Sequence, residues 1–260
     1  MSAGPHPIVV HGRPLAQGRL PAVCVPLVAR TADALLAEAA AAAAQGPDLL
    51  EWRVDFFEGA ARSDEVVARA SRLRQAASGL PLLFTRRSPD EGGQPAALDD
   101  AQVAALYQAV CRARCVDLVD VEMQADPALV AAVCDAAREA GITLVLSFHD
   151  FQRTPPAAEL LERFRLAHRL GADVAKVAVM PQSRADVLAL LQATCEAGET
   201  LPIAVAGMAM GPVGVVSRVC GGAFGSALTF GAGQAASAPG QLPVAALRAA
   251  LAVFRVVDRD

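Results

Sequence analysis

Short apolar segments alternate with longer amphipathic ones along most of the chain. Apolar runs of strand length occur at residues 22–28, 48–55, 81–87, 116–122, 142–149, 173–180, 202–208 and 226–231. Segments with helical spacing of their apolar residues follow them, at 31–45, 63–78, 99–113, 126–140, 156–170, 183–197, 212–220 and 243–256. Strands that are apolar on both faces are typical of parallel sheets covered by helices. Residues that could cap helices stand at four of the predicted helix starts, namely Thr31, Ser63, Asp126 and Ser183.

The eightfold alternation predicts a (β/α)8 TIM barrel, an α/β fold, in a single domain over residues 1–260. No change of composition along the chain marks a second domain. An open doubly wound sheet is the alternative architecture, but it would favour a GxGxxG turn after the first strand, and none follows residues 22–28. Ahead of that strand, residues 1–20 are predicted to include a short hairpin that caps the bottom of the barrel.

The composition argues against several classes of partner. Hydrophobic residues make up 54% of the 260 residues, yet glycines, prolines and charges interrupt each apolar run before it reaches the length of a membrane span. The net charge of −4 argues against a nucleic-acid partner, which usually requires a basic face. The first residues show no basic segment followed by an apolar core, so we expect a cytoplasmic protein. The 6 cysteines lack the spacing of a zinc site, and no metal ligands are predicted.

The chain contains a single lysine. Of the 23 Lys plus Arg residues, 22 are arginines and the remaining one is Lys176, in an apolar segment with Val174, Ala178 and Val179. Arginine stays protonated and cannot act as a nucleophile, whereas a desolvated lysine loses its proton readily. Burial among these residues would disfavour the ammonium form. We therefore interpret Lys176 as an amine that forms a Schiff base; a structural lysine whose amine reaches water at a strand end is the alternative.

Polar residues gather at the ends of five consecutive predicted strands. Side chains two apart in a strand point to the same face. The groups that share a face are Glu51 with Arg53 and Asp55, Thr85 with Arg87, Asp120 with Glu122, Ser147 with His149, and Val174 with Lys176. Because reactive groups in a barrel gather where the strands end, these residues predict the mouth of an active site.

The residue types at this mouth suggest imine chemistry. A neutral lysine amine attacks a ketone to form an imine, and the protonated imine withdraws electrons from the neighbouring carbon. His149 is the candidate base for the acidified proton, because an ordinary histidine pKa near about 6.5 suits proton transfer at neutral pH. Arg53, Arg87 and Arg218 offer forks that match carboxylates and hydroxyls. We therefore expect a small, anionic, oxygen-rich ketone as the substrate.

Six motifs occur in a fixed order along the chain: EWRVD, LLFTRRSPDEGG, LSFHDFQRTP, GADVAKVAVMPQS, SRVCGGAFGSALTF and SAPGQ. In this order and spacing they resemble type I 3-dehydroquinate dehydratase of the shikimate pathway, from about the second strand to the last helix. The resemblance implies a (β/α)8 barrel, usually a homodimer, that dehydrates 3-dehydroquinate to 3-dehydroshikimate. It also implies that the reaction needs neither a metal nor an organic cofactor.

The resemblance assigns roles to individual residues. Lys176 matches the Schiff-base lysine, His149 the general acid and base, and Glu91 a glutamate that orients this histidine. The other matches are substrate contacts: Glu51, Arg53 and Arg87 toward the ring hydroxyls and the ketone, Met210 as an apolar contact, Arg218 toward the carboxylate, and Ser237 with Gln241 in a loop that closes over the substrate.

The loop over residues 231–241 consists of small residues and is long enough to form a lid over the mouth; a slack surface connection is the alternative.

Two other functions also stay open. A class I aldolase has a barrel lysine that forms an imine, but it cleaves a carbon–carbon bond. A catalytically silent barrel that binds a metabolite as a sensor should have lost Lys176 or His149, and both are present.

Overall fold

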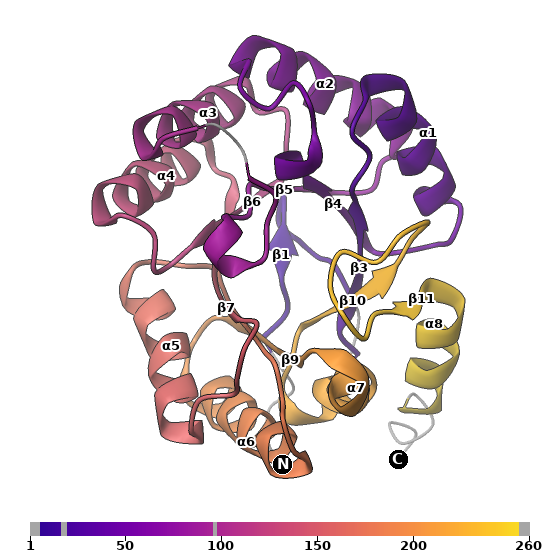
Figure 1. Ribbon diagram of the computed structural model, residues 1–260, viewed down its shortest axis with the longest axis vertical. Helices are drawn as coiled ribbons and strands as arrows, with labels where there is room; N and C mark the ends of the chain where they lie inside the picture. The colour runs from indigo at the N-terminus through magenta and orange to yellow at the C-terminus, as the bar shows by residue number, and fades with distance from the viewer. Residues whose placement is uncertain (1–5, 17–19, 96–97, 255–260) are drawn as a thin grey trace.

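The computed structural model describes residues 6–16, 20–95 and 98–254, and its strands form a ring surrounded by helices (Figure 1). The barrel strands are β3 (Ala22–Leu27), β4 (Leu49–Arg53), β5 (Leu82–Thr85), β6 (Leu118–Glu122), β7 (Thr143–Asp150), β8 (Val174–Val179), β9 (Ala204–Ala209) and β10 (Leu228–Ala232). Neighbouring strands pair in parallel from β10 through β3 to β9. A parallel bridge between Val205 and Ser226 joins β9 to the chain just before β10. The prediction of a closed (β/α)8 barrel is confirmed.

A helix follows each barrel strand and covers the outside of the ring (Figure 1). The helices are α1 (Ala32–Ala43), α2 (Ser63–Ala76), α3 (Asp100–Ala113), α4 (Pro127–Ala140), α5 (Ala157–Arg169), α6 (Arg184–Thr200), α7 (Gly211–Cys220) and α8 (Val244–Ala252). Short 3-10 helices lie at η1 (Val54–Phe56), η2 (Pro89–Glu91) and η3 (Gly221–Phe224). Within the described ranges, no helix combines the length and the apolar character that crossing a membrane would require.

The N-termini of four helices can be compared with the capping residues predicted for them. Asp126 accepts hydrogen bonds from two backbone N–H groups at the start of α4, and Ser183 forms a reciprocal capping box at the start of α6, as predicted. Thr31 occupies the N-cap position of α1, but its side chain makes no capping hydrogen bond. The prediction for Ser63 is wrong by one residue, because α2 begins at Ser63 and its N-cap is Arg62.

The apolar residues form two layers, one on each side of the strands. Along β8, Ala175 and Val177 belong to the outer core beneath the helices, whereas Val174 and Ala178 belong to the core inside the barrel. Lys176 stands between Val174 and Ala178 in this alternation, so its side chain points into the barrel. The period-two pattern thus placed the single lysine on the inner face correctly.

The chain before β3 closes the bottom of the barrel. β1 (Val9–Val10) and β2 (Arg13–Pro14) pair antiparallel, which confirms a hairpin, although a shorter one than the predicted cap. Ile8 and Val10 are buried in the inner core and fill the bottom of the ring. Of the predicted cap, residues 1–5 and 17–19 lie outside the described residues. A plugged bottom leaves the opposite end, where the strands terminate, as the open end.

Candidate active site

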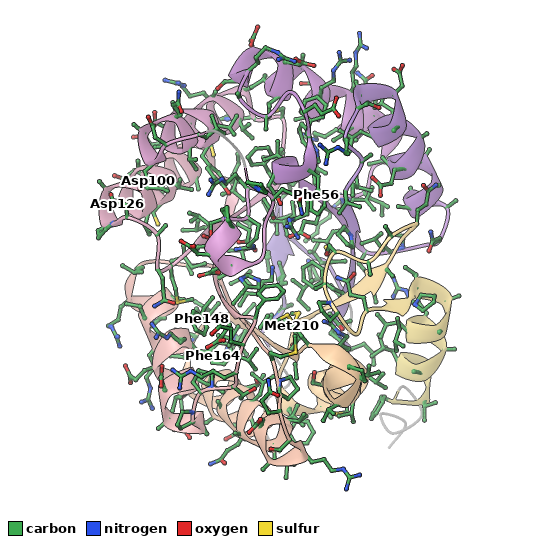
Figure 2. All side chains as sticks on the ribbon, in the orientation of Figure 1. Phe56, Asp100, Asp126, Phe148, Phe164 and Met210 are labelled. Carbon is green, nitrogen blue, oxygen red and sulfur yellow. The ribbon has the colours of Figure 1, made fainter. Side chains whose placement is uncertain are left out.

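A pocket opens at the carboxyl ends of the barrel strands and encloses about 430 Å³ of empty space, its mouth included. Its lining residues are Glu51, Arg53, Arg87, Glu91, His149, Phe151, Lys176, Ala178, Met208, Met210, Arg218, Phe230, Ser237, Ala238 and Gln241. Every residue to which the family resemblance assigned a role is among them, whereas the other predicted strand-end residues, such as Asp120 and Ser147, are not. Figure 2 labels Met210, which lies near the middle of the ring of strands. The tertiary structure therefore gathers these residues around one space.

Lys176 is buried in β8 but not in purely apolar surroundings. Its side chain is 5% exposed, and its Nζ lies 2.9 Å from Asp120 Oδ2 and 4.0 Å from Glu51 Oε1. The ring of Phe230 lies 4.7 Å from the same nitrogen. The predicted burial is observed, but a carboxylate and an aromatic face also lie beside the amine, and both stabilise a positive charge there. Val179, moreover, faces the outer core rather than the lysine.

Asp120 connects Lys176 to a buried network. Its Oδ1 accepts hydrogen bonds from Arg87 at 2.8 Å and from Ser147 Oγ at 2.6 Å, and the residue is 0% exposed. Burial alone would raise the pKa of Asp120, but the charges of Arg87 and Lys176 outweigh it and hold that pKa well below its usual range. Asp120 therefore remains an anion.

Arg87 lies at the centre of the network, at the end of β5. Its Nη1 donates to Ser147 Oγ at 2.8 Å and to Glu122 Oε1 at 3.2 Å, and lies 3.8 Å from Glu91 Oε2. The guanidinium is 3% exposed. Because Asp120 pairs with Lys176 and Glu91 pairs with His149, the charge of Arg87 lies between the two sides of the site.

His149 is held by Glu91. The Nδ1 atom of the imidazole lies 2.8 Å from Glu91 Oε2, and the backbone N–H of His149 donates to the same oxygen at 3.0 Å. Burial and the nearby charges of Arg87 and Lys176 lower the pKa of His149 well below its usual range, so its imidazole is neutral at neutral pH. Burial raises the pKa of Glu91 to about 8. With Nδ1–H directed at Glu91, Nε2 keeps the lone pair that a base requires.

The turn that carries Glu91 depends on a glycine. Ser88 accepts a hydrogen bond from the backbone N–H of Glu91 and caps η2, and Gly92 ends it in the left-handed region with a φ of 83°. Phe151 stacks on His149, with ring centroids 6.5 Å apart. A Cβ on Gly92 would come within 2.4 Å of the Phe151 ring, so only glycine allows this approach.

Arg53 is held by Asp55, a residue that was predicted to lie in the same strand. β4 ends at Arg53, and the next residues form η1, so Asp55 does not lie in a strand as expected. Asp55 nevertheless accepts two hydrogen bonds from Arg53, both at 2.8 Å, and it also accepts the backbone N–H of Gln94 at 3.0 Å. Glu51 instead accepts a hydrogen bond from Thr85 Oγ1 at 2.9 Å. The bidentate pair orients Arg53 at the rim of the pocket.

Arg218 lies in the last turn of α7 and meets the loop that leads out of β10. Its Nη2 donates to the carbonyl oxygen of Pro239 at 3.1 Å, and burial lowers its pKa to about 10. Among the described residues, no carboxylate lies within ion-pair distance of this guanidinium, and its buried Nε has no hydrogen-bond partner. A buried cation in this state is suited to receive an anionic ligand.

The loop itself is shorter than the predicted lid. β10 extends to Ala232, and β11 (Leu242–Pro243) pairs with it in parallel, so the loop occupies residues 233–241. Gln241 closes it by accepting the Ser237 N–H at 2.9 Å and donating to Ser237 Oγ at 3.1 Å. The backbone N–H of Gly211 donates to Pro239 at 3.1 Å, which holds the loop against the start of α7.

Sequence reasoning missed several residues of the site. Asp120 was recognised only as sharing a face with Glu122, and its contact with Lys176 crosses two strand boundaries that no local pattern records. Phe151, Met208 and Phe230 also line the pocket, and each lies in or directly after a barrel strand, where an apolar residue attracts no notice. In the described ranges, no group of three or more His, Cys, Asp and Glu side chains could hold a metal ion.

The comparisons with known proteins agree with one another. The family model of the type I 3-dehydroquinases matches residues 23–258. The 3-dehydroquinate dehydratase of Albidiferax ferrireducens is 50% identical over 254 residues, which cover 98% of this chain and 96% of the relative. The crystal structure of 3-dehydroquinate dehydratase from Geobacillus kaustophilus matches with a TM-score of 0.94 and 43% identity over 100% of both chains. That of the type I enzyme from Clostridium difficile with covalently modified comenic acid matches with a TM-score of 0.91 and 35% identity, covering 97% of this chain and 98% of that one.

Proposed function

This chain belongs to the type I 3-dehydroquinase family and dehydrates 3-dehydroquinate in the shikimate pathway, and we propose that Lys176 and His149 carry out the reaction. The observation that carries the assignment is that the single lysine and the Glu91-bound imidazole line the same pocket. The family distinguishes this activity from the aldolase and sensor functions that the residues alone left open. Lys176 acts as the Schiff-base amine, and His149 acts as the acid and base.

Lys176 begins the reaction. Its amine, once deprotonated, adds to the ketone carbon, and loss of water gives a protonated imine. His149 then removes a proton from the adjacent carbon, and the electron pair moves toward the imine nitrogen. The same imidazole returns the proton to the departing hydroxyl group, so that water leaves and a carbon–carbon double bond forms. Hydrolysis of the imine releases 3-dehydroshikimate and restores the amine.

The arginines position the substrate. Arg218 has no carboxylate partner in the described residues, so it binds the carboxylate of 3-dehydroquinate. Arg53, oriented by Asp55, contacts the ring hydroxyls together with Glu51 and Arg87. The remaining contacts are the apolar side chain of Met210 and the loop residues Ser237 and Gln241.

The loop over residues 233–241 acts as a lid. It is held against the start of α7 by Pro239, and Pro239 also accepts the hydrogen bond from Arg218. An anion bound to Arg218 therefore lies next to the lid, and its binding would favour closure. Closure excludes water from the imine during proton transfer.

Reduction with borohydride tests the assignment. The protein is incubated with 3-dehydroquinate and borohydride, which delivers hydride to the imine carbon and leaves a stable secondary amine on the protein. Because the chain has one lysine, peptide mass spectrometry should find the adduct on Lys176 and not on the N-terminal amine. Turnover is followed in parallel by the ultraviolet absorbance of the conjugated enone product.

Two variants serve as controls. Lys176→Arg keeps the charge beside Asp120 but cannot form an imine, so it should lose both the adduct and turnover by several orders of magnitude. His149→Ala should slow turnover by roughly 10²–10⁴-fold while still giving the adduct. Turnover by Lys176→Arg above about a percent of wild type would contradict imine catalysis, and normal turnover by His149→Ala would show that the base is misassigned.

The assembly and location of the protein are further parts of the proposal. We expect a homodimer, and Val213 and Val216 on α7 are exposed apolar residues suited to such a contact. Light scattering coupled to gel filtration would measure the mass in solution, and a monomer would contradict this expectation. We also propose a cytoplasmic location for this metabolic enzyme, and fractionation of cells would test it.

A further inference from the structure

Asp120 is a buried carboxylate to which the mechanism proposed above gives no role. It does not line the pocket, so it is not placed to contact a substrate. Arg87 and Ser147 hold its Oδ1, whereas its Oδ2 lies 2.9 Å from Lys176 Nζ. One oxygen is therefore fixed by the barrel, and the other is presented to the nitrogen that reacts.

Asp120 is not suited to accept the proton that Lys176 must lose. Arg87 and Lys176 hold the pKa of Asp120 far below its usual range in spite of burial, so the group is a carboxylate when the nitrogen of Lys176 carries a positive charge. His149, which is buried and neutral, is the base that faces the same pocket. The two groups thus divide the work: His149 moves protons, and Asp120 supplies a permanent negative charge.

We propose that Asp120 is the counter-ion of the protonated imine on Lys176. This inference rests on the proposed function. When the ammonium group is replaced by a protonated imine, the positive charge stays on the same nitrogen, so the buried ion pair is preserved. A neutral imine would leave the carboxylate with one cation fewer, and an uncompensated buried charge is strongly unfavourable. Asp120 therefore keeps the imine protonated, which maintains the electron withdrawal on which proton removal depends.

Other charged groups surround the same nitrogen. Glu51 lies farther away, at 4.0 Å, and its Oε1 already accepts a hydrogen bond from Thr85. The titratable and charged groups packed around Lys176 and Asp120 are Cys24, Glu51, Arg53, Arg87, Glu91, Glu122 and His149. Among them, Asp120 makes the shortest contact with Nζ, and it is the one carboxylate in the described residues that lies within 3 Å of that atom.

Asp120→Asn and Glu122→Gln form a matched pair for the test. Each removes a carboxylate that bonds to Arg87, at 2.8 Å and 3.2 Å, but only Asp120 also contacts Lys176. Asp120→Asn should lower kcat by roughly 10²–10³-fold and reduce the fraction of imine that borohydride traps. It should also move the acid limb of the kcat/KM profile to lower pH, because the ammonium has lost its neighbouring anion. Glu122→Gln should lower kcat by less than about 10-fold and leave that limb in place.

Isotope labelling gives a second measurement, which uses the wild-type protein. Lysine labelled with ¹⁵N at Nζ introduces a single signal, because Lys176 is the only lysine. An ammonium held by a buried carboxylate exchanges hydrogen with water slowly, so wild type should give a ¹H–¹⁵N correlation at neutral pH. Asp120→Glu, which keeps the charge, should keep the trapped adduct and the position of the acid limb.

The outcomes separate the inference from the function on which it rests. If Asp120→Asn and Glu122→Gln lose activity alike and the acid limb does not move, Asp120 only supports the fold and the proposal is wrong. If Asp120→Asn does not fold, absence of the wild-type ¹H–¹⁵N correlation, or loss of the adduct in Asp120→Glu, overturns it. If wild type itself gives no adduct on Lys176, the proposed function fails instead.

Discussion

Gly92 links the backbone to the acid–base pair, and replacing it with alanine is the most informative single change. It follows Glu91 directly, has a φ of 83°, and lies against the Phe151 ring that stacks on His149. Gly79 is a matched control: its φ is 84°, but an added Cβ there would meet nothing within 4 Å. Gly79 lies in the loop between α2 and β5, at the opposite end of the barrel from the pocket. The two alanine variants therefore share the backbone strain and differ in the collision.

The magnitudes follow from the geometry. A left-handed conformation costs an alanine about 1–2 kcal/mol of unfolding free energy, and both variants should show this loss. At Gly92 the new Cβ would lie 2.4 Å from two carbons of Phe151, about 1 Å closer than ordinary contact at 3.4 Å. Because Phe151 is only half-buried, its ring can turn aside, and the collision should add roughly 1 kcal/mol. A displacement of about 1 Å at the Glu91 turn should lower kcat by roughly 10²-fold.

Urea unfolding and steady-state kinetics test both halves of this prediction. Gly79→Ala should show the loss of stability with kcat unchanged, whereas Gly92→Ala should show a somewhat larger loss of stability and the large fall in kcat. Borohydride trapping should still label Lys176 in both variants, since neither change touches the amine. If Gly92→Ala retains the kcat of Gly79→Ala, then the position of the Phe151 ring and of the Glu91 turn does not control His149, and our account of how the base is oriented is wrong.

Three further predictions concern the buried carboxyl, the lid and a tyrosine of the outer core. Burial raises the pKa of Glu91 from 4.5 to about 8, so between these pH values the folded state holds a proton that the unfolded state has lost. The free energy of unfolding of the wild type should therefore fall, relative to that of Glu91→Gln, as the pH rises through this range. The fall should reach up to about 1.4 kcal/mol per pH unit. Urea unfolding across that range measures the difference, and a constant difference would refute it. Gln241→Leu removes both hydrogen bonds to Ser237, so KM should rise about 10-fold with little change in stability, and an unchanged KM would count against the lid. The hydroxyl of Tyr107 donates to the Asp120 carbonyl and accepts the Arg86 N–H, so Tyr107→Phe should destabilise the fold by about 1–3 kcal/mol in thermal unfolding; an unshifted Tm would contradict this.

Much of the fold could be predicted because the barrel depends on a repeated local pattern. Each strand is apolar on both faces, since one face meets the helices and the other meets the inner core, as Val174 and Ala175 show on β8. The same period of two assigned Lys176 to the inner face. The ends of elements were less accurate, because the residues of η1 continue the apolar alternation of β4 although the backbone has already turned.

The candidate site could likewise be predicted only in part from the sequence. All residues that the family motifs assigned to the site line the pocket, because a family resemblance gives the positions of functional residues directly in the sequence. They did not identify the partners of those residues. Arg53 pairs with Asp55, and Asp120 reaches Lys176 across β7.

The sequence by itself determined which residues face the inside of the barrel, that one lysine is available for covalent chemistry, and where the open end must lie. The tertiary structure decided which charges meet: Arg87 follows β5, Asp120 and Lys176 come from β6 and β8, and the pairing of the strands brings the three together. The physical reason is that alternation along one strand specifies which face a side chain occupies, but not which residue of another strand lies at the same level along the barrel axis. The state of the amine, the anion beside it and the neutral imidazole depend on those levels, and so on the closed barrel as a whole.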